Sequence, residues 1–181
     1  METSSLQKNR PHLEGVFGPL SASIDSRIRE ILSEVDEILL EIAHHFGRER
    51  AGWEGSGLEL SWMESGQLAI SSYVGTCTQK GGCIDFCLEL RPSWYFGERS
   101  SVLTWDVEST VEADCQHTVD HAHMHTVHEV SVRVESAIEA ALALCSAARE
   151  LQRLASEVPL EHWLELSSDA ESPTAANLPT L

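Results

Sequence analysis

The hydrophobic periodicity of this chain changes twice, and this constrains the fold more than any other feature of the sequence. Apolar residues recur every three or four positions from Ile24 to Phe46, which predicts an amphipathic helix. Between Leu58 and Val134 apolar and polar residues alternate, as is typical of strands. The helical spacing returns after Ser136, which has the spacing of a capping box with Glu139.

The alternating part of the chain divides into five expected strands, because glycine and proline turn signals interrupt it. The strands are expected at about 58–62, 68–74, 84–90, 103–113 and 130–134. The dipeptide Arg91-Pro92 is expected to end the third strand, and Trp94, Tyr95 and Phe96 then form an aromatic-rich loop. Such regular alternation is typical of an antiparallel sheet with one buried face and one face in water.

Each helix has one apolar stripe and the sheet has one apolar face, so these surfaces must cover one another. We therefore expect an α+β two-layer sandwich. Two main helices pack on one face of a five-stranded antiparallel meander, in the order α-β-β-β-β-β-α. A single domain over 21–166 follows, with a flexible lead-in at 1–20 and a disordered tail at 167–181 that is rich in Ser, Ala, Pro and Asp.

The charge of the chain restricts its partners. The sequence contains 29 Asp and Glu against 12 Lys and Arg, which gives a formal net charge of −17. This charge disfavours binding to nucleic acid and to acidic membrane surfaces, and it favours a basic protein partner or metal cations. We find neither an apolar run long enough to cross a bilayer nor an apolar stretch near Met1 that is typical of a signal peptide.

The cysteines are five in number and scattered along the sequence. A chain of this length does not need disulfides to fold, so we expect reduced thiols and a cytoplasmic location. The positions concerned are Cys77, Cys83, Cys87, Cys115 and Cys145.

The open face of the sheet is the first candidate site. Asp106, Glu108 and Glu112 alternate with apolar residues and are expected to point into water. Trp94 and Tyr95 are either a flap over the core or anchors at an interface, where aromatic residues are frequent. No Gly-x-Ser-x-Gly, phosphate-binding glycine loop or dinucleotide fingerprint occurs in the sequence.

The leading hypothesis is therefore a non-enzymatic binding or accessory protein. It recognises a basic protein through its acidic face, as immunity or inhibitor-like proteins do. An exposed sheet edge also favours self-association into a homo-oligomer.

A histidine-rich segment between the last two strands is the second candidate site. His-x-His on a strand places two imidazoles on one face, so His121, His123 and His125, with Asp114, are candidate ligands for Zn²⁺ or another divalent cation. The alternative function is a metal-binding protein or metal-dependent enzyme. A solvated acidic strand, whose histidines only balance local charge, explains the same residues.

The register of this hairpin depends on its loop. A four-residue loop over Thr118–His121 sets Asp114 opposite His125 and Val111 opposite His128. A three-residue loop would bury Ser131 and Arg133, so we reject it unless a β-bulge intervenes and expect the four-residue loop. That shorter loop would gather Cys115, His117, His121 and His123.

Overall fold

The computed structural model describes residues 15–18, 21–49, 53–55, 57–62, 67–78, 82–96, 101–115 and 124–170. Its elements are α3 (Ala22–Glu49), β1 (Trp53–Gly55), β2 (Glu59–Trp62), β3 (Leu68–Cys77), β4 (Cys83–Phe96), β5 (Ser101–Asp114), β6 (Met124–Val134), α4 (Ala137–Glu157) and α5 (Leu160–Ala170). This order confirms the α+β sandwich predicted from the periodicity. The five expected strands are β2 to β6, and β1 is an additional short strand.

The sheet is antiparallel throughout and follows the order β1-β3-β4-β5-β6. β2 also pairs with β3, so β1 and β2 share one edge of the sheet. Leu58, between these two strands, donates its backbone N–H to Asp36 Oδ1 of α3 at 2.8 Å. A Cβ atom on Gly57 would lie 2.8 Å from the same oxygen, so a larger residue here would have to displace the Asp36 carboxylate that Leu58 binds.

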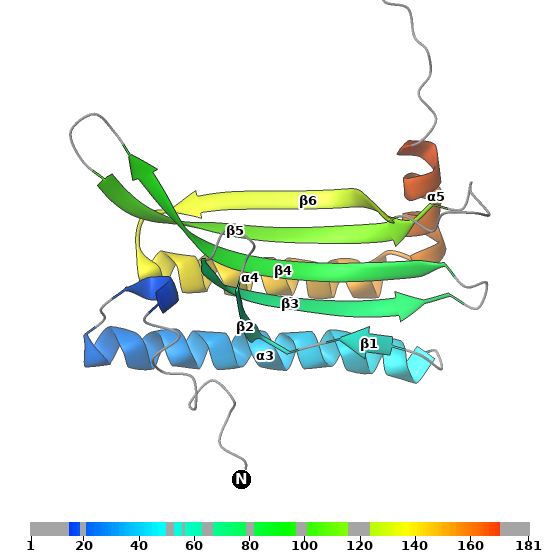
Figure 1. Ribbon diagram of the computed structural model, residues 1–181. Coiled ribbons are helices and arrows are strands. Elements are labelled where there is room, and N and C mark those ends of the chain that lie inside the picture. Colours follow the sequence, from blue (N-terminus) through cyan, green and yellow to red (C-terminus); the bar gives the residue numbers. More distant parts are fainter. Residues whose placement is uncertain are drawn as a thin grey trace, which may run out of the picture.

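The two long helices lie side by side on one face of the sheet and run in the same direction (Figure 1). α4 contacts β4, β5 and β6, whereas α3 contacts α4, β1 and β3. α5 closes one end of the layer against β5 and β6. Ser136 caps α4 as predicted, because its Oγ accepts the Glu139 N–H at 3.3 Å. Ser136 Oγ also donates to Glu139 Oε2 at 2.7 Å, so the two residues of the expected capping box contact each other through their side chains.

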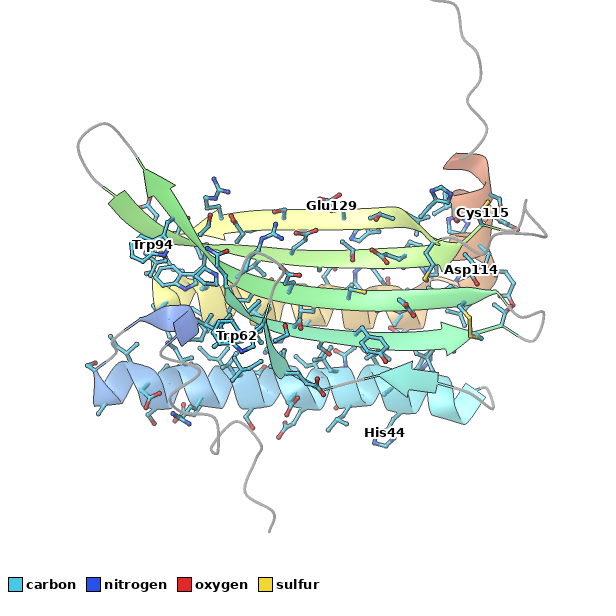
Figure 2. All side chains as sticks on the ribbon, viewed as in Figure 1. His44, Trp62, Trp94, Asp114, Cys115 and Glu129 are labelled. Atoms are coloured by element: carbon cyan, nitrogen blue, oxygen red, sulfur yellow. A yellow bond between two sulfur atoms is a disulfide. The ribbon has the colours of Figure 1, made fainter. Side chains whose placement is uncertain are left out.

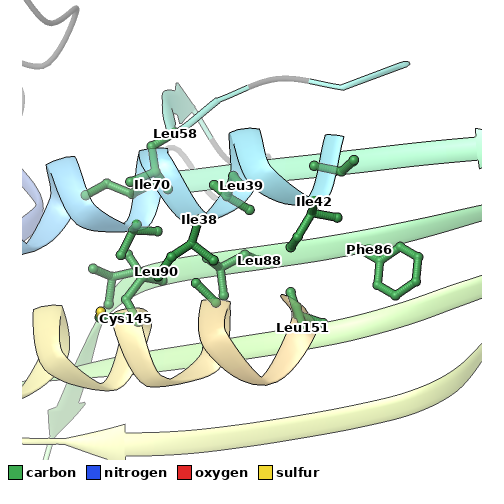
Figure 3. Packing of buried hydrophobic residues seen from close by; sticks show 14 of the residues in the cluster. Ile38, Leu39, Ile42, Leu58, Ile70, Phe86, Leu88, Leu90, Cys145 and Leu151 are labelled. Carbon is green, nitrogen blue, oxygen red and sulfur yellow. The ribbon is translucent and has the colours of Figure 1, made fainter. Parts of the chain in front are cut away.

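The core lies between the helices and the inner face of the sheet (Figure 3). Full burial of one such side chain contributes about 1.5–3 kcal/mol before the loss of chain entropy is counted. The largest fully buried side chains are Phe46, Phe86, Ile28, Leu32, Leu39, Ile42, Ile70, Ile84, Leu88, Leu90 and Leu144.

The third expected strand does not end at Arg91-Pro92. β4 continues to Phe96, and Trp94 and Tyr95 pair with Leu103 and Val102 of β5. The loop expected over these aromatic residues is therefore wrong. The pairing of β4 with β3 ends at Leu90, so Pro92 lies where β4 has only one neighbouring strand, a position that tolerates proline.

Two segments expected outside the domain contribute to it. Gly15–Phe17 forms a helical turn in which Val16 and Phe17 are buried, and Trp105 Nε1 donates to the Val16 carbonyl at 2.8 Å. Ser167 in α5 is also buried and donates to the Ala113 carbonyl at 2.8 Å. The flexible lead-in and the disordered tail thus do not extend to these residues.

Candidate partner-binding face

The outer face of the sheet is the side opposite α3 and α4. Asp106, Glu108 and Glu112 of β5 lie on it, because they alternate with the buried inner residues Trp105, Val107 and Val111. The strand pairing adds carboxylates from β4 and β6 to the same face. The outer face divides into two halves that differ in how these carboxylates are balanced.

In the first half, which we call the arginine half, two guanidinium groups pair with three carboxylates. Glu89 and Glu108 are directly opposite one another, and Arg91 bridges them with contacts of 3.2 Å to each. Arg133 donates from Nε and Nη2 to the two oxygens of Asp106, at 2.6 and 3.3 Å. The hydrogen bond to Asp106 raises the pKa of Arg133. Asp106 is only 8% exposed, so this half is internally satisfied.

In the second half, which we call the carboxylate half, Asp85, Glu112 and Asp114 lie in adjacent rows of β4 and β5. Figure 2 shows Asp114 near the end of β5. Asp85 is directly opposite Glu112, so two like charges face each other across the strands. Asp114 Oδ2 accepts the backbone N–H of Cys83 at 2.7 Å. Among the described strand residues in these rows, none is Lys or Arg.

A disulfide lies at the end of the carboxylate half. Cys77 and Cys83 are direct partners at the end of the β3–β4 hairpin, with their Cα atoms 4.1 Å apart, and they form a disulfide. The expectation that all cysteines are reduced is therefore wrong for this pair. Cys87, Cys115 and Cys145 are not part of a disulfide. Burial, with smaller contributions from Glu112 and Asp85, raises the pKa of the Cys87 thiol to about 11.

The aromatic candidates lie at the other end of the sheet. Trp94 is on β4 and remains 53% exposed, although its pairing with Leu103 places it in line with the apolar positions (Figure 2). Trp62 of β2 is 72% exposed, which sequence reasoning did not anticipate. Tyr95 pairs with Val102, but its side chain is outside the described residues. Trp94 and Trp62 are thus large apolar side chains available for contact.

The β5–β6 ladder contains a β-bulge that changes the histidine site. Val111 pairs with His128, as the four-residue loop predicts, but Glu112 pairs with Thr126, so Val127 is the extra residue. Beyond the bulge, Asp114 pairs with Met124 and the buried inner residue Ala113 pairs with His125. The expected pairing of Asp114 with His125 is therefore wrong, because these two side chains lie on opposite faces.

The register beyond the bulge is the one that the three-residue loop requires. Of the residues that this loop would gather, Cys115 is described and buried, whereas His117, His121 and His123 lie outside the described residues. Within the described part of the chain, no three His, Cys, Asp or Glu side chains are arranged to hold a metal ion.

His128 faces the helix side and packs against Trp163 of α5, with ring centroids 6.4 Å apart. Its Nε2 atom is buried and has no hydrogen-bond partner among the described residues, and the same holds for Trp163 Nε1. The histidines of β6 that the structure describes therefore belong to the helix side of the sheet.

Comparison with known proteins adds no relative: no family model, curated protein or solved structure matches this chain. None of the described helices is long and apolar enough to span a membrane.

Proposed function

We propose that this chain is a non-enzymatic binding or accessory protein that recognises a basic protein segment through the outer face of its sheet. The mode of action would resemble that of immunity or inhibitor-like proteins. One observation carries the proposal: Asp85 is opposite Glu112, with Asp114 in the next row, and the described strand residues of these rows include no Lys or Arg.

Two like charges directly opposite each other on a sheet destabilise the fold. A Lys or Arg side chain from a partner, placed beside Glu112, would offset its repulsion with Asp85. The net charge of −17 would also steer a basic partner toward the protein and increase the rate of association. The carboxylate half is therefore the part of the face proposed to contact the partner.

Asp106 and Glu108 were expected from the sequence to bind the partner, but we assign them a structural role instead. Both are already paired with arginines of the same chain, so a partner's cation would have to displace Arg133 or Arg91. Their role is to hold the sheet in shape beneath the binding surface. Trp94, which is 53% exposed, supplies a second, apolar contact region near the end of β4, since exposed aromatic residues are frequent anchors of interfaces. Tyr95 remains a candidate of the same region from the sequence alone.

The test is co-purification of the tagged full-length chain from its own cells at low salt, with elution by salt. The variant Asp85→Asn/Glu112→Gln is expected to lose the partner, because it removes both opposed charges. The matched control Glu89→Gln/Glu108→Gln removes two charges from the same strands in the arginine half and is expected to retain it. Absence of a partner at every salt concentration, or equal loss in both variants, would overturn the proposal.

A second candidate function, metal binding, is favoured by the register beyond the β-bulge. That pairing is the one required to gather Cys115, His117, His121 and His123. Asp114 and His125 are not both ligands in this proposal, because their side chains lie on opposite faces of the sheet. Elemental analysis of untagged protein decides the matter, and the proposal fails if there is neither stoichiometric metal nor a thermal shift with Zn²⁺.

A cytoplasmic location remains a prediction from the sequence. The Cys77–Cys83 disulfide points the other way, because disulfides persist mainly in oxidising compartments. Rapid acid quenching of cells, followed by alkylation of free thiols, measures the redox state of this pair. A fully reduced pair in the cell would favour the cytoplasm.

A further inference from the structure

The free edge of β6 is the longest uninterrupted strand edge in the described part of the sheet. β6 is the last strand in the sheet order, and no described strand pairs with its second edge. The stretch from His128 to Val134 keeps a single register with β5. The opposite edge is divided between the short strands β1 and β2. A long regular edge of this kind is a template for pairing with another strand.

Two side chains on this edge are apolar but exposed. Val130 and Val132 face the helix side, because they pair with the inner residues Ser109 and Val107, yet they are 41% and 43% exposed. The two long helices thus do not fully cover β6. A strand added at this edge would bury both valines.

The outer side of the same edge carries charges in an alternating row. Arg91 of β4, Asp106 of β5 and Arg133 of β6 are direct neighbours across three strands. Arg133 uses Nε and Nη2 to bind Asp106, and its Nη1 donates to no described residue. The next strand would therefore continue the row best with a carboxylate opposite Arg133.

Glu129 supplies that carboxylate. It lies on the outer face of β6, opposite Thr110, is exposed and makes no ion pair with any described residue. Glu129 and Arg133 are equally distant from Ser131. A two-fold axis through Ser131 would therefore place Glu129 opposite the partner's Arg133, and Arg133 opposite the partner's Glu129.

We propose that a second copy of this chain pairs with the β6 edge in antiparallel orientation about a two-fold axis at Ser131. The same axis sets Val130 opposite the partner's Val132, so the inner face is complementary as well. Directly opposed residues must share a face, so the axis has to pass through a residue and not between two residues.

Neighbouring axes are less favourable. An axis through Val132 would bring Glu129 against the partner's Glu135, and an axis through Val130 would pair Glu129 with the partner's Ser131. An axis through Glu129 or Arg133 itself would oppose like charges.

This dimer is independent of the proposed partner-binding face. Asp85 and the disulfide lie on β3 and β4. Glu112 lies on β5, so β6 separates it from the free edge, and both copies would present these residues on one continuous outer face. Failure of the dimer would leave the binding proposal intact, and failure of partner capture would leave the dimer intact.

The test is sedimentation equilibrium of the full chain over a wide concentration range. The expected species has twice the 20.0 kDa mass of the chain. Glu129→Arg would place two arginines opposite each other at both ends of the interface and is expected to raise the dissociation constant at least about tenfold. Arg133→Glu would oppose two glutamates in the same positions, and the same increase is expected. The double variant Glu129→Arg/Arg133→Glu restores opposite charges and is expected to recover most of the affinity. Glu59→Arg, on the opposite edge, is the matched control and is expected to leave the affinity unchanged.

A second measurement does not depend on charge reversal. Ser131→Cys would place two thiols at the two-fold axis, where oxidation is expected to give a disulfide-linked dimer, whereas Thr126→Cys is expected to give none. Circular dichroism confirms that each variant is folded. A species of 20.0 kDa at every concentration overturns the proposal, as does a dimer that folded Glu129→Arg does not weaken or that Ser131→Cys does not cross-link.

Discussion

The two halves of the outer face contain similar carboxylates in different settings. In the arginine half, Glu89 and Glu108 oppose each other but share Arg91, and Asp106 is buried beside Arg133. In the carboxylate half, Asp85 and Glu112 oppose each other in rows whose described strand residues include no Lys or Arg, and a disulfide closes the hairpin beside them. Carboxylates on one face of a sheet thus differ in whether an arginine of the sheet pairs with them.

The largest expected effect in the carboxylate half is on the reactivity of the Cys87 thiol. Burial and the nearby Glu112 and Asp85 raise the pKa of this thiol to about 11, so at pH 8 its thiolate fraction is roughly a hundredfold lower than that of an ordinary thiol. Its alkylation rate, measured by peptide mass spectrometry, is expected to rise about tenfold per pH unit up to that pKa. The urea-unfolded chain is the control, and equal rates in both states would contradict the raised pKa of Cys87 in the folded protein.

Removal of the disulfide tests whether a covalent bond holds the carboxylate half together. Cys77 and Cys83 are separated by 6 positions, and a loop of this size predicts that Cys77→Ala/Cys83→Ala lowers the free energy of unfolding by about 2 kcal/mol. Urea denaturation measures the change. A reductant is expected to destabilise the wild type by the same amount and to leave the variant unaffected. Unchanged stability of the variant would show that the hairpin does not need this bond.

Asp106→Asn tests the structural role of the arginine half. The change keeps the size of the side chain, which is itself 11% exposed, but removes the charge that holds Arg133. The free energy of unfolding is expected to fall by about 1–2 kcal/mol. Chemical denaturation measures this change. Asp106→Asn should lower the denaturant concentration at the midpoint without changing the slope of the unfolding free energy against denaturant concentration. A neutral outcome would remove the distinction between the two halves.

Glu112→Gln is the same kind of substitution in the other half, and the expected effect is smaller and of opposite sign. It relieves the repulsion with Asp85 and is expected to raise the free energy of unfolding by about 0.5 kcal/mol. Added salt screens the same repulsion, so the gain is expected to shrink at high ionic strength. A loss of stability would mean that Glu112 already has a favourable partner.

The fold could be predicted because the apolar periodicity that indicates it is repeated over many residues. The alternation over β5 assigns Asp106, Glu108 and Glu112 to one face and Trp105, Val107 and Val111 to the other, and a single substitution would not obscure it. The pairing of Val111 with His128 followed from the same alternation. Patterns that depend on many residues thus survive local irregularities.

The features that were missed depend on single residues. The bulge at Val127 is one additional residue, and nothing in the text His125-Thr126-Val127-His128 distinguishes it from regular strand. The burial of Val16 depends on Trp105, 89 positions away in the chain. The disulfide did have a signal: Cys77 and Cys83 are placed symmetrically about Lys80, which begins the Lys80-Gly81-Gly82 turn signal.

The order of the elements has a consequence for the synthesis of the protein on the ribosome. α3 is made first, but it meets α4 through residues far along the chain, as in the pairing of Arg149 with Glu34 across 115 positions. Until α4 has emerged, the apolar side of β4 and β5 lacks its main cover, because α4 is the long helix that contacts both. A nascent chain therefore exposes Phe86, Leu88 and Val107 to the surrounding cell until α4 has left the ribosome, and it needs either shielding by a chaperone or rapid closure once α4 is available.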